Sequence, residues 1–565
     1  MAIDHPAAFP RLLRFYEMGN FCAIPFTAYH LLLLFPLLAI TSYLAYRRWK
    51  KHRLCQQLQC QLSGPSYNHI DPLFGLDFIY DHGRNIRAHR FAEGLRDGFG
   101  KYGTTYSSRM GFQDIIHTID PVNLETIMKS QARDYDIIPH RSRIVELVFG
   151  KGVFSTNQDE RRVSRDLVHR GLAGLRLLGR DQGIDDAYED GVQAMIERIR
   201  RMQAEGREGV TIDFGAAARR YTSFVARSVI FGREEEKEHD SDCEAEQFCA
   251  DFAILSKIAQ SMTLLANTIL SRYSFVYAWL WKDFRRVKWS VFHYVDRRTE
   301  GILQTRDGRS RNEGADERKG GTARSVLEEI LLSSTRGREQ DLSRIRGEAL
   351  NLFLAGNDTV HIALTELFWL LTRSPETWQK LREEVGSALN GRQPAFQELR
   401  ELTYLRWVIN EAFRLRPTLA AHARIAHRNT VLPRGGGPSG LHPLLVAKGT
   451  YVAYSNYALH RDPNVFGADV DVFRPERWAS IKPSKFEFLP FGVGQRRCPG
   501  EKMGWSMVTY AVVRLAQEVE RLQPPREGED LLWEEAGSFA FFNRHGVHLR
   551  VGWCWSCWNM IVNNL

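Results

Sequence analysis

The feature that most constrains this 565-residue sequence is the segment Phe491-Gly492-Val493-Gly494-Gln495-Arg496-Arg497-Cys498-Pro499-Gly500. A cysteine that binds a metal must be held as the thiolate and point at one face of the ion. Glycines let a backbone fold tightly around the sulfur, so that peptide N–H groups can donate to it. A helix that begins near Gly500 would add a favourable dipole. The segment therefore predicts a thiolate ligand at Cys498 rather than an ordinary buried cysteine.

Every fixed position of the pattern F-x-x-G-x-R-x-C-x-G is matched here, and at this point the sequence resembles the cytochrome P450 superfamily over about residues 70–551. The resemblance implies a mainly α fold with a minor β component, a haem b with an axial thiolate, and monooxygenase activity. The cofactor contacts that it implies are Cys498, the propionate-binding Arg496, Arg165 and Arg424, and Phe491 and Gly492 of the loop. Arg161 stands where the superfamily often has Trp.

Two further motifs fit this resemblance. Glu411 and Arg414 are three residues apart and share a helix face. With Arg477, from Phe473-Arg474-Pro475-Glu476-Arg477-Trp478, they resemble the superfamily's buried structural cluster on the haem-side core. Alone, a Glu-x-x-Arg pair carries no weight, because chance matches are frequent.

The second motif is Ala355-Gly356-Asn357-Asp358-Thr359, within a helical pattern. The resemblance places this turn on the distal side of the haem, where Asp358 and Thr359 would pass protons during oxygen activation. The alternative is a threonine that only bonds back to the carbonyl four residues earlier. The substrate-pocket residues implied by the resemblance are Ala355, Leu419, Ala420 and Phe541.

The helical elements are predicted from apolar periodicity and end signals. One long helix spans Asp341 to Leu371 with Asp341 as N-cap, and Ser374-Pro375 suits the start of the next. A helix over about residues 402–416 stops at Pro417, and a last one runs from about Gly500 to Leu522. The charged, glycine-rich stretch 305–323 predicts a mobile loop.

The N-terminal region predicts a membrane anchor. From Phe21 to Tyr46 there is no Asp, Glu, Lys or Arg, and about 20 residues of helix cross a bilayer. A basic run follows at residues 47–53, which by the positive-inside rule places the rest of the chain in the cytosol. A buried helix of a soluble protein is the alternative. The expected organisation is a lumenal segment 1–20, a transmembrane signal anchor 21–46 in the endoplasmic reticulum membrane, a basic juxtamembrane segment and linker 47–75, a catalytic domain 76–551, and a tail 552–565.

Several other patterns are set aside. Gly435 to Gly440 matches G-x-G-x-x-G, but Pro438 and the β-like sequel favour a turn over a dinucleotide loop. Cys554 and Cys557 have redox spacing but lie in the terminal tail. The eight cysteines are sparse, which favours a reducing compartment over a disulfide framework. The net charge of +9 comes largely from the basic run, and we expect no nucleic-acid partner.

The segments Gly150–Phe154, Leu432–Gly440, Lys448-Gly449, Leu459–Arg461 and Phe473–Trp478 resemble the fungal membrane-bound alkane and fatty-acid hydroxylases. The resemblance implies insertion of one oxygen atom from O2 into a lipophilic substrate, with electrons from NADPH through NADPH-cytochrome P450 reductase. Long-chain hydroxylation is the first hypothesis. Tailoring of a fungal secondary metabolite is the second. A haem-thiolate isomerase or a non-catalytic haem protein would be of another class.

Overall fold

The computed structural model describes residues 26–177, 182–204, 211–233, 239–266, 283–312, 325–334, 341–525, 533–537 and 540–553. The chain forms two compact units that divide between Leu62 and Ser63. In the first unit, helix α1 (Phe26–Leu58) continues past residue 46 through the basic run, while residues 21–25 of the predicted anchor lie outside the described residues. No helix within the described ranges has both the length and the apolar character needed to cross a membrane.

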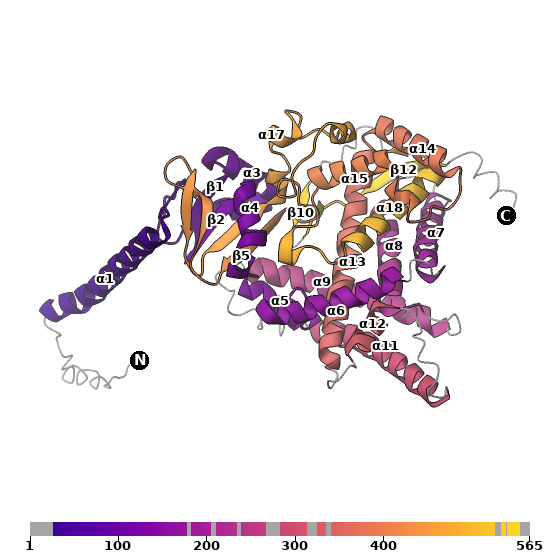
Figure 1. The fold of residues 1–565 in the computed structure, drawn as a ribbon, viewed down its shortest axis with the longest axis horizontal. Helices are drawn as coiled ribbons and strands as arrows, with labels where there is room; N and C mark the ends of the chain where they lie inside the picture. The colour runs from indigo at the N-terminus through magenta and orange to yellow at the C-terminus, as the bar shows by residue number, and fades with distance from the viewer. Residues whose placement is uncertain are drawn as a thin grey trace, which may run out of the picture. The chain divides into compact units, whose positions relative to one another are not determined.

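The second unit is mainly helical with a smaller β component, as predicted (Figure 1). Its longer helices are α2 (Leu76–Arg87), α3 (Phe91–Tyr102), α5 (Pro139–Phe149), α6 (Gln158–Leu177), α7 (Gln182–Ala204), α8 (Phe214–Phe231), α9 (His239–Ala266), α11 (Phe284–Asn312), α12 (Val326–Ser334), α13 (Leu342–Leu371), α14 (Pro375–Leu389), α15 (Thr403–Leu415) and α18 (Glu501–Glu518). Short helices are α4 (Pro121–Glu125), α16 (Asn456–Leu459) and α17 (Pro463–Phe466).

A five-stranded sheet lies at one side of this unit, with the strand order β1-β2-β8-β5-β3. Its strands are β1 (Thr105–Met110), β2 (Gln113–Thr118), β3 (Tyr135–Asp136), β5 (Ala421–Ala426) and β8 (Tyr451–Ser455). β2 and β8 run parallel, and the other neighbours are antiparallel. This sheet joins residues near position 110 to residues near position 425, and so brings distant parts of the sequence together.

Three small sheets account for the other strands among the described residues. Their strands are β4 (Ile212–Asp213), β6 (Thr430–Gly436), β7 (His442–Val446), β9 (Val519–Gln523), β10 (Glu535–Gly537), β11 (Phe541–Asn543) and β12 (His548–Trp553). β6 pairs with β7, so the segment from Gly435 to Gly440 comprises the last two residues of β6 and the hairpin turn after them, in agreement with the predicted turn. β12 lies between β4 and β9, and β10 pairs with β11 as a short hairpin.

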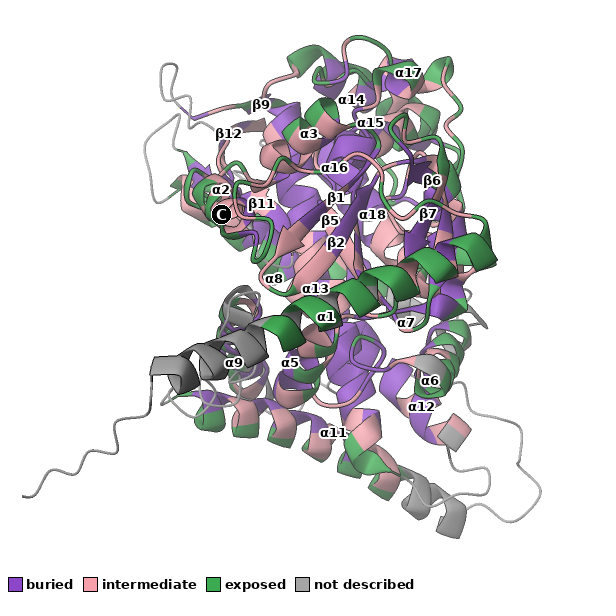
Figure 2. Ribbon diagram, turned by 90° about the vertical axis from the view of Figure 1, so that its left-hand side faces the viewer, coloured by how far each residue is buried: buried purple, intermediate pink, exposed green. Residues whose placement is uncertain are grey.

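Helix α13 runs through the middle of the second unit and is buried over most of its length (Figure 2). It contacts α5, α6, α8, α11, α12, α14, α15, α18 and β11. The helix starts where predicted, because the Asp341 side chain accepts a hydrogen bond from the Arg344 N–H at 3.0 Å. Because α13 contacts elements from early and late in the sequence, its polar side chains can bond to segments that are far apart along the chain.

Two predicted boundaries are wrong. The last helix ends at Glu518 rather than near Leu522, because Val519–Gln523 forms β9 and takes its hydrogen bonds from β12. The loop predicted from residue 305 is helical as far as Asn312, because extending an existing helix costs far less than starting one. The remainder of that loop lies outside the described residues. Helix α15 matches its prediction to within one residue at each end.

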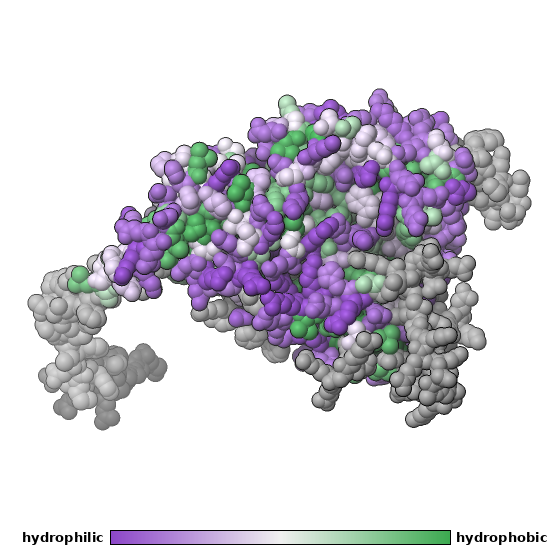
Figure 3. Space-filling model, in the orientation of Figure 1, coloured by the Kyte–Doolittle hydropathy of each residue, from purple (hydrophilic) through white to green (hydrophobic). Residues whose placement is uncertain are grey.

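The face of the second unit that is turned to the viewer in Figure 3 is mostly hydrophilic, with apolar groups scattered among polar ones. Such a surface is ordinary for a globular body. Large exposed apolar side chains do gather at the start of the unit, where Ile70, Leu73, Phe74 and Leu76 precede or begin α2 and Phe112 lies in the β1–β2 turn.

Candidate active site

Cys498 lies in a closed loop just before α18. Its N–H donates to the Phe491 carbonyl at 2.9 Å, and the N–H of Gly500 donates to the sulfur. Gly494 has φ +71°, and a Cβ there would lie 1.9 Å from the Met128 carbonyl oxygen, so that only glycine fits. Burial raises the pKa of the Cys498 thiol to about 11. A metal ion bound to the sulfur would lower this pKa and favour the thiolate.

Neighbouring side chains hold this loop from two sides. The Phe491 ring packs edge-on against Phe413 of α15, with centroids 5.7 Å apart. Arg165, on α6, donates to the Arg497 carbonyl at 2.9 Å, and its positive charge lowers the pKa of the Cys498 thiol. The loop, α6 and α15 thus meet around the sulfur.

A cluster of arginines lies beside the same loop. Arg496 donates to Asn157 Oδ1 at 2.7 Å, but its buried Nε has no partner among the described residues. Burial and repulsion from Arg424, Arg161 and Arg141 lower the pKa of Arg496 to about 9. The nearest acid is Asp136, with an oxygen 3.9 Å from Arg496 Nη2.

Four guanidinium groups around one carboxylate make a strongly cationic, half-buried site. Buried charge of one sign is stable only when an opposite charge offsets it. A dianionic ligand whose carboxylates reach these arginines would supply that charge. The two propionates of a haem fit this requirement, and the adjoining Cys498 fits the requirement for an axial sulfur ligand.

The Ala355–Thr359 turn of α13 presents a polar group on each side. The Asp358 carboxylate accepts hydrogen bonds from Ser256 of α9 and from Asn357, both at 3.0 Å, and lies 3.7 Å from Arg219 of α8. Burial raises the pKa of Asp358. The Thr359 hydroxyl donates to the Ala355 carbonyl at 2.6 Å, so the back-bonded geometry considered from sequence is present. Its oxygen retains the capacity to accept a proton donor.

Glu411 lies at the centre of a buried cluster. It accepts from Arg414 Nη2 and from Arg477 Nε, each at 2.8 Å, and from Trp478 Nε1 at 3.0 Å. Arg414 also donates to the Val470 carbonyl at 2.6 Å. The cluster joins α15 to the 466–478 segment, in the arrangement that the sequence predicts for Glu411, Arg414 and Arg477.

The residues predicted for a substrate pocket are only partly brought together. Ala420 and Phe541 are buried in one apolar cluster with Tyr457 and Ala92. The Phe541 N–H donates to the Thr418 carbonyl at 2.8 Å, so β11 adjoins the segment that carries half-buried Leu419. Ala355 lies separately on α13, on the same helix turn as Thr359.

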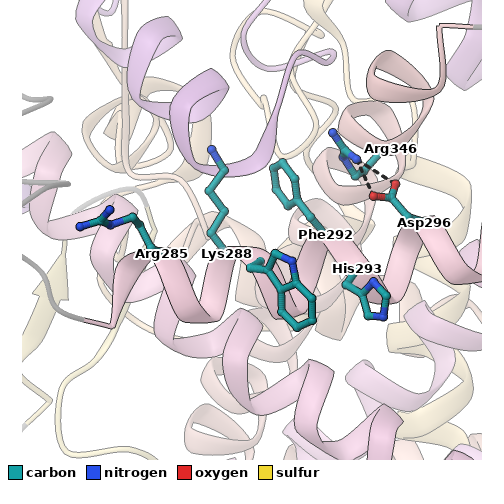
Figure 4. A pocket seen from close by; sticks show the side chains of 7 residues that line it. Arg285, Lys288, Phe292, His293, Asp296 and Arg346 are labelled. Carbon is teal, nitrogen blue, oxygen red and sulfur yellow. Dashed lines mark hydrogen bonds and ion pairs between the residues drawn. The ribbon is translucent and has the colours of Figure 1, made fainter.

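A separate surface hollow of about 450 Å³ lies along α11 and the first turns of α13 (Figure 4). It is lined by Arg285, Lys288, Trp289, Phe292, His293, Asp296 and Arg346. Arg346 donates to both carboxylate oxygens of Asp296, at 2.6 and 2.9 Å. None of the predicted site residues lines this hollow, and we keep it apart from the candidate active site.

Three residues near the site were not found from sequence. Arg141, on α5, adds to the arginine cluster, and burial and repulsion from Arg424 lower its pKa to about 10. Asp136 supplies the opposing charge. His460 is fully buried and its Nε2 accepts from the Leu489 N–H at 2.9 Å, which fixes it as a neutral structural group. Helix α5 also carries His140, Arg143 and Glu146, so no local sequence signal distinguishes Arg141.

Comparison with known proteins assigns the family. A family model described as Cytochrome P450 matches residues 72–539. The chain is 32% identical over 486 residues to Cytochrome P450 monooxygenase himC of Aspergillus japonicus, covering 86% of this chain and 82% of that protein. It is 30% identical over 512 residues to Cytochrome P450 monooxygenase FPY7 of Fusarium mangiferae, covering 90% and 92%. It is 31% identical over 420 residues to Cytochrome P450 52A5 of Candida maltosa, covering 72% and 75%. The chain therefore belongs to the cytochrome P450 family of haem-thiolate monooxygenases.

Proposed function

We propose that this enzyme binds haem b with Cys498 as the axial ligand, and that it inserts one atom of O2 into a lipophilic substrate. The observation that carries the proposal is the buried Cys498 loop beside a cluster in which four arginines surround one carboxylate, that of Asp136. Arg496, Arg424 and Arg165 would bind the propionate side, with Arg161 and Arg141 adding to the positive potential. Phe491 and Gly492 would form the wall around the sulfur.

The haem, when bound, supplies the redox chemistry of oxygen activation, and the protein supplies protons and shape. We assign proton delivery to Asp358 and Thr359. Asp358 pairs with Arg219, whose half-exposed side chain links it to the solvent, and it accepts a hydrogen bond from the Ser256 hydroxyl. The Thr359 hydroxyl donates its one O–H to the Ala355 carbonyl, and its oxygen can accept a hydrogen bond from a proton donor in the site.

A flavoprotein reductase that oxidises NADPH is the proposed electron source. Lys502, in the first turn of α18 after the Cys498 loop, is exposed and pairs with no acid among the described residues. A positive charge there suits an acidic docking face. A haem-thiolate isomerase needs no external electrons, so product formation that is independent of NADPH would identify that alternative class.

For the substrate we propose a long, mostly apolar chain such as a fatty acid or alkane, oxidised at carbon. Support comes from the apolar Leu419, Ala420 and Phe541 and from the resemblance of several segments to fungal lipid hydroxylases. Each additional buried methylene contributes about 0.8 kcal/mol, so affinity should rise along a homologous series of acids until the pocket is full. The test is the haem spectral shift on adding C12 to C16 acids or alkanes. A shift with polycyclic metabolites alone would favour tailoring of a secondary metabolite.

We also propose that residues 21–46 anchor the enzyme in the endoplasmic reticulum membrane, with the catalytic unit in the cytosol. Support comes from the uncharged sequence, the basic run after it and the helical conformation from Phe26 onward. The apolar group around α2 adds to this, since Ile70 and Phe112 are 91% and 93% exposed and the Phe74 and Phe112 rings are 5.4 Å apart.

Fractionation of microsomes tests the anchor. Deleting residues 1–46 should convert an integral protein into one that high salt releases, and adding Ile70→Asp and Phe112→Asp should release it at lower salt. A C-terminal tag that proteases cannot reach in intact microsomes would contradict the cytosolic orientation.

A further inference from the structure

Another buried acidic side chain of α13, that of Glu366, lies two helical turns beyond Thr359. Glu366 is 1% exposed, and both of its carboxylate oxygens accept hydrogen bonds. The Asn543 N–H donates to Oε1 at 2.7 Å, and the Trp533 indole N–H donates to Oε2 at 2.8 Å. Neither donor can act as an acceptor, so both carboxylate oxygens must accept. Burial raises the pKa of Glu366, although Arg416 and these two hydrogen bonds act to lower it.

The charge of Glu366 is offset by Arg416. The Arg416 Nε lies 4.0 Å from Glu366 Oε2, and the guanidinium stacks on the Trp533 ring with its carbon 3.7 Å from the centroid. The same guanidinium lies 5.2 Å from the centroid of Trp369. Arg416 is the C-cap residue that follows α15, just before the segment that carries Leu419 and Ala420.

The two donors to Glu366 lie on the two sides of the β10–β11 hairpin. Trp533 precedes β10, and Asn543 ends β11. A single carboxylate therefore ties both arms of the hairpin to α13. Phe541, on β11, contacts Trp533 with ring centroids 4.8 Å apart, and its N–H bonds to the Thr418 carbonyl.

We propose that Glu366 is a positioning residue, which fixes the β10–β11 hairpin against the distal helix and thereby sets the size of the ligand that fits over the haem. The proposal rests on the proposed placement of haem beside Cys498 and of α13 on its distal side. Glu366 itself touches neither haem nor substrate. It acts through the hairpin and through Phe541.

Glu366→Gln is the test variant, because the amide keeps the volume but turns an N–H2 group toward one of the two donors. The matched control is Glu348→Gln. Glu348 lies on the same helix, is equally buried, accepts the Val153 N–H at 2.9 Å and lies 3.8 Å from Arg344. Trp533→Phe is a second test variant that removes one donor and leaves a ring in place.

The first readout is hydrogen exchange of the holoenzyme. In Glu366→Gln, amide exchange in a peptide that covers residues 540–548 should accelerate by about tenfold, as loss of one ordinary hydrogen bond would produce. Glu348→Gln should leave that peptide unchanged. Exchange that is unaltered by Glu366→Gln, or equally altered by Glu348→Gln, overturns the proposal.

The second readout is spectral titration with two iron-binding probes, imidazole and 4-phenylimidazole. Glu366→Gln and Trp533→Phe should change the ratio of the two dissociation constants, because we expect the larger probe, and not imidazole, to extend as far as the hairpin. A ratio equal to wild type in both variants contradicts the proposal, whereas wild-type enzyme that binds neither probe contradicts the haem assignment itself. The carbon monoxide spectrum of each variant shows whether it retains its haem.

Discussion

Glu411→Gln is the perturbation whose effect can be worked most directly from the structure. Five donors converge on this carboxylate: Arg414 Nε and Nη2, Arg477 Nε, Trp478 Nε1 and the Arg474 N–H, at 2.8–3.0 Å. The Arg414 and Arg477 side chains are 0% and 1% exposed, so water cannot solvate their guanidinium groups when the negative charge of Glu411 is removed. Arg477 keeps Asp469, 2.9 Å away, as a partner, but the remaining hydrogen bonds of Arg414 to described residues are all to carbonyl groups.

Removing one partner of a buried ion pair costs about 3–5 kcal/mol, because the other charge stays buried. Total stabilities of domains are about 5–15 kcal/mol, so Glu411→Gln should lose a large part of its stability and its haem. The assay is urea unfolding followed by circular dichroism and haem absorbance. Glu476→Gln, which breaks a Lys380 pair whose glutamate is 42% exposed, is the control and should cost less than about 1 kcal/mol. Equal midpoints for the two variants would refute the reasoning.

Three further outcomes are expected. Thr359→Ala should lower product formed per NADPH by roughly 10²-fold while NADPH oxidation and hydrogen peroxide release continue, and an unchanged yield would leave Thr359 as a helix residue only. Lys502→Glu should slow reduction by the reductase at low salt and less so at high salt; an equal rate at low salt removes Lys502 from the docking face. Burial raises the pKa of Glu535 to about 7. The folded state thus holds a proton that the unfolded chain loses near pH 4, and the stability from Glu535 falls as pH rises through about 7. The free energy of unfolding of Glu535→Gln, relative to that of wild type, should therefore rise by up to about 3 kcal/mol from pH 4 to pH 8. A difference between the two proteins that does not change with pH would contradict this.

Local sequence signals were sufficient to predict the structure where all of the interacting residues lie in one segment. Asp341 caps its own helix, and the Cys498 loop is closed by its own Phe491 carbonyl. Glu411 and Arg414 are three residues apart on one helix, so their pairing follows from helical geometry. The amino-acid sequence alone is therefore enough to place these elements.

The parts that could not be predicted depend on segments that only the fold brings together. The arginine cluster draws Arg141, Arg161, Arg424 and Arg496 from four separate elements, and no local pattern reports their summed charge. Glu366 and Arg416 are 50 positions apart, and nothing in the sequence near either one predicts that both lie against Trp533. Val519–Gln523 continues a helical pattern, but pairing with β12 makes it a strand.

The most direct test of the central claim is the absorption spectrum of the reduced enzyme with carbon monoxide, measured on wild type and on Cys498→Ser. If Cys498 supplies the axial thiolate, wild type shows the long-wavelength band that gives the superfamily its name, and Cys498→Ser lacks it. Cys554→Ser and Cys557→Ser, as controls in the tail, should keep it. An undiminished band in Cys498→Ser would show that the iron has another ligand, and the assignment of the active site would be wrong.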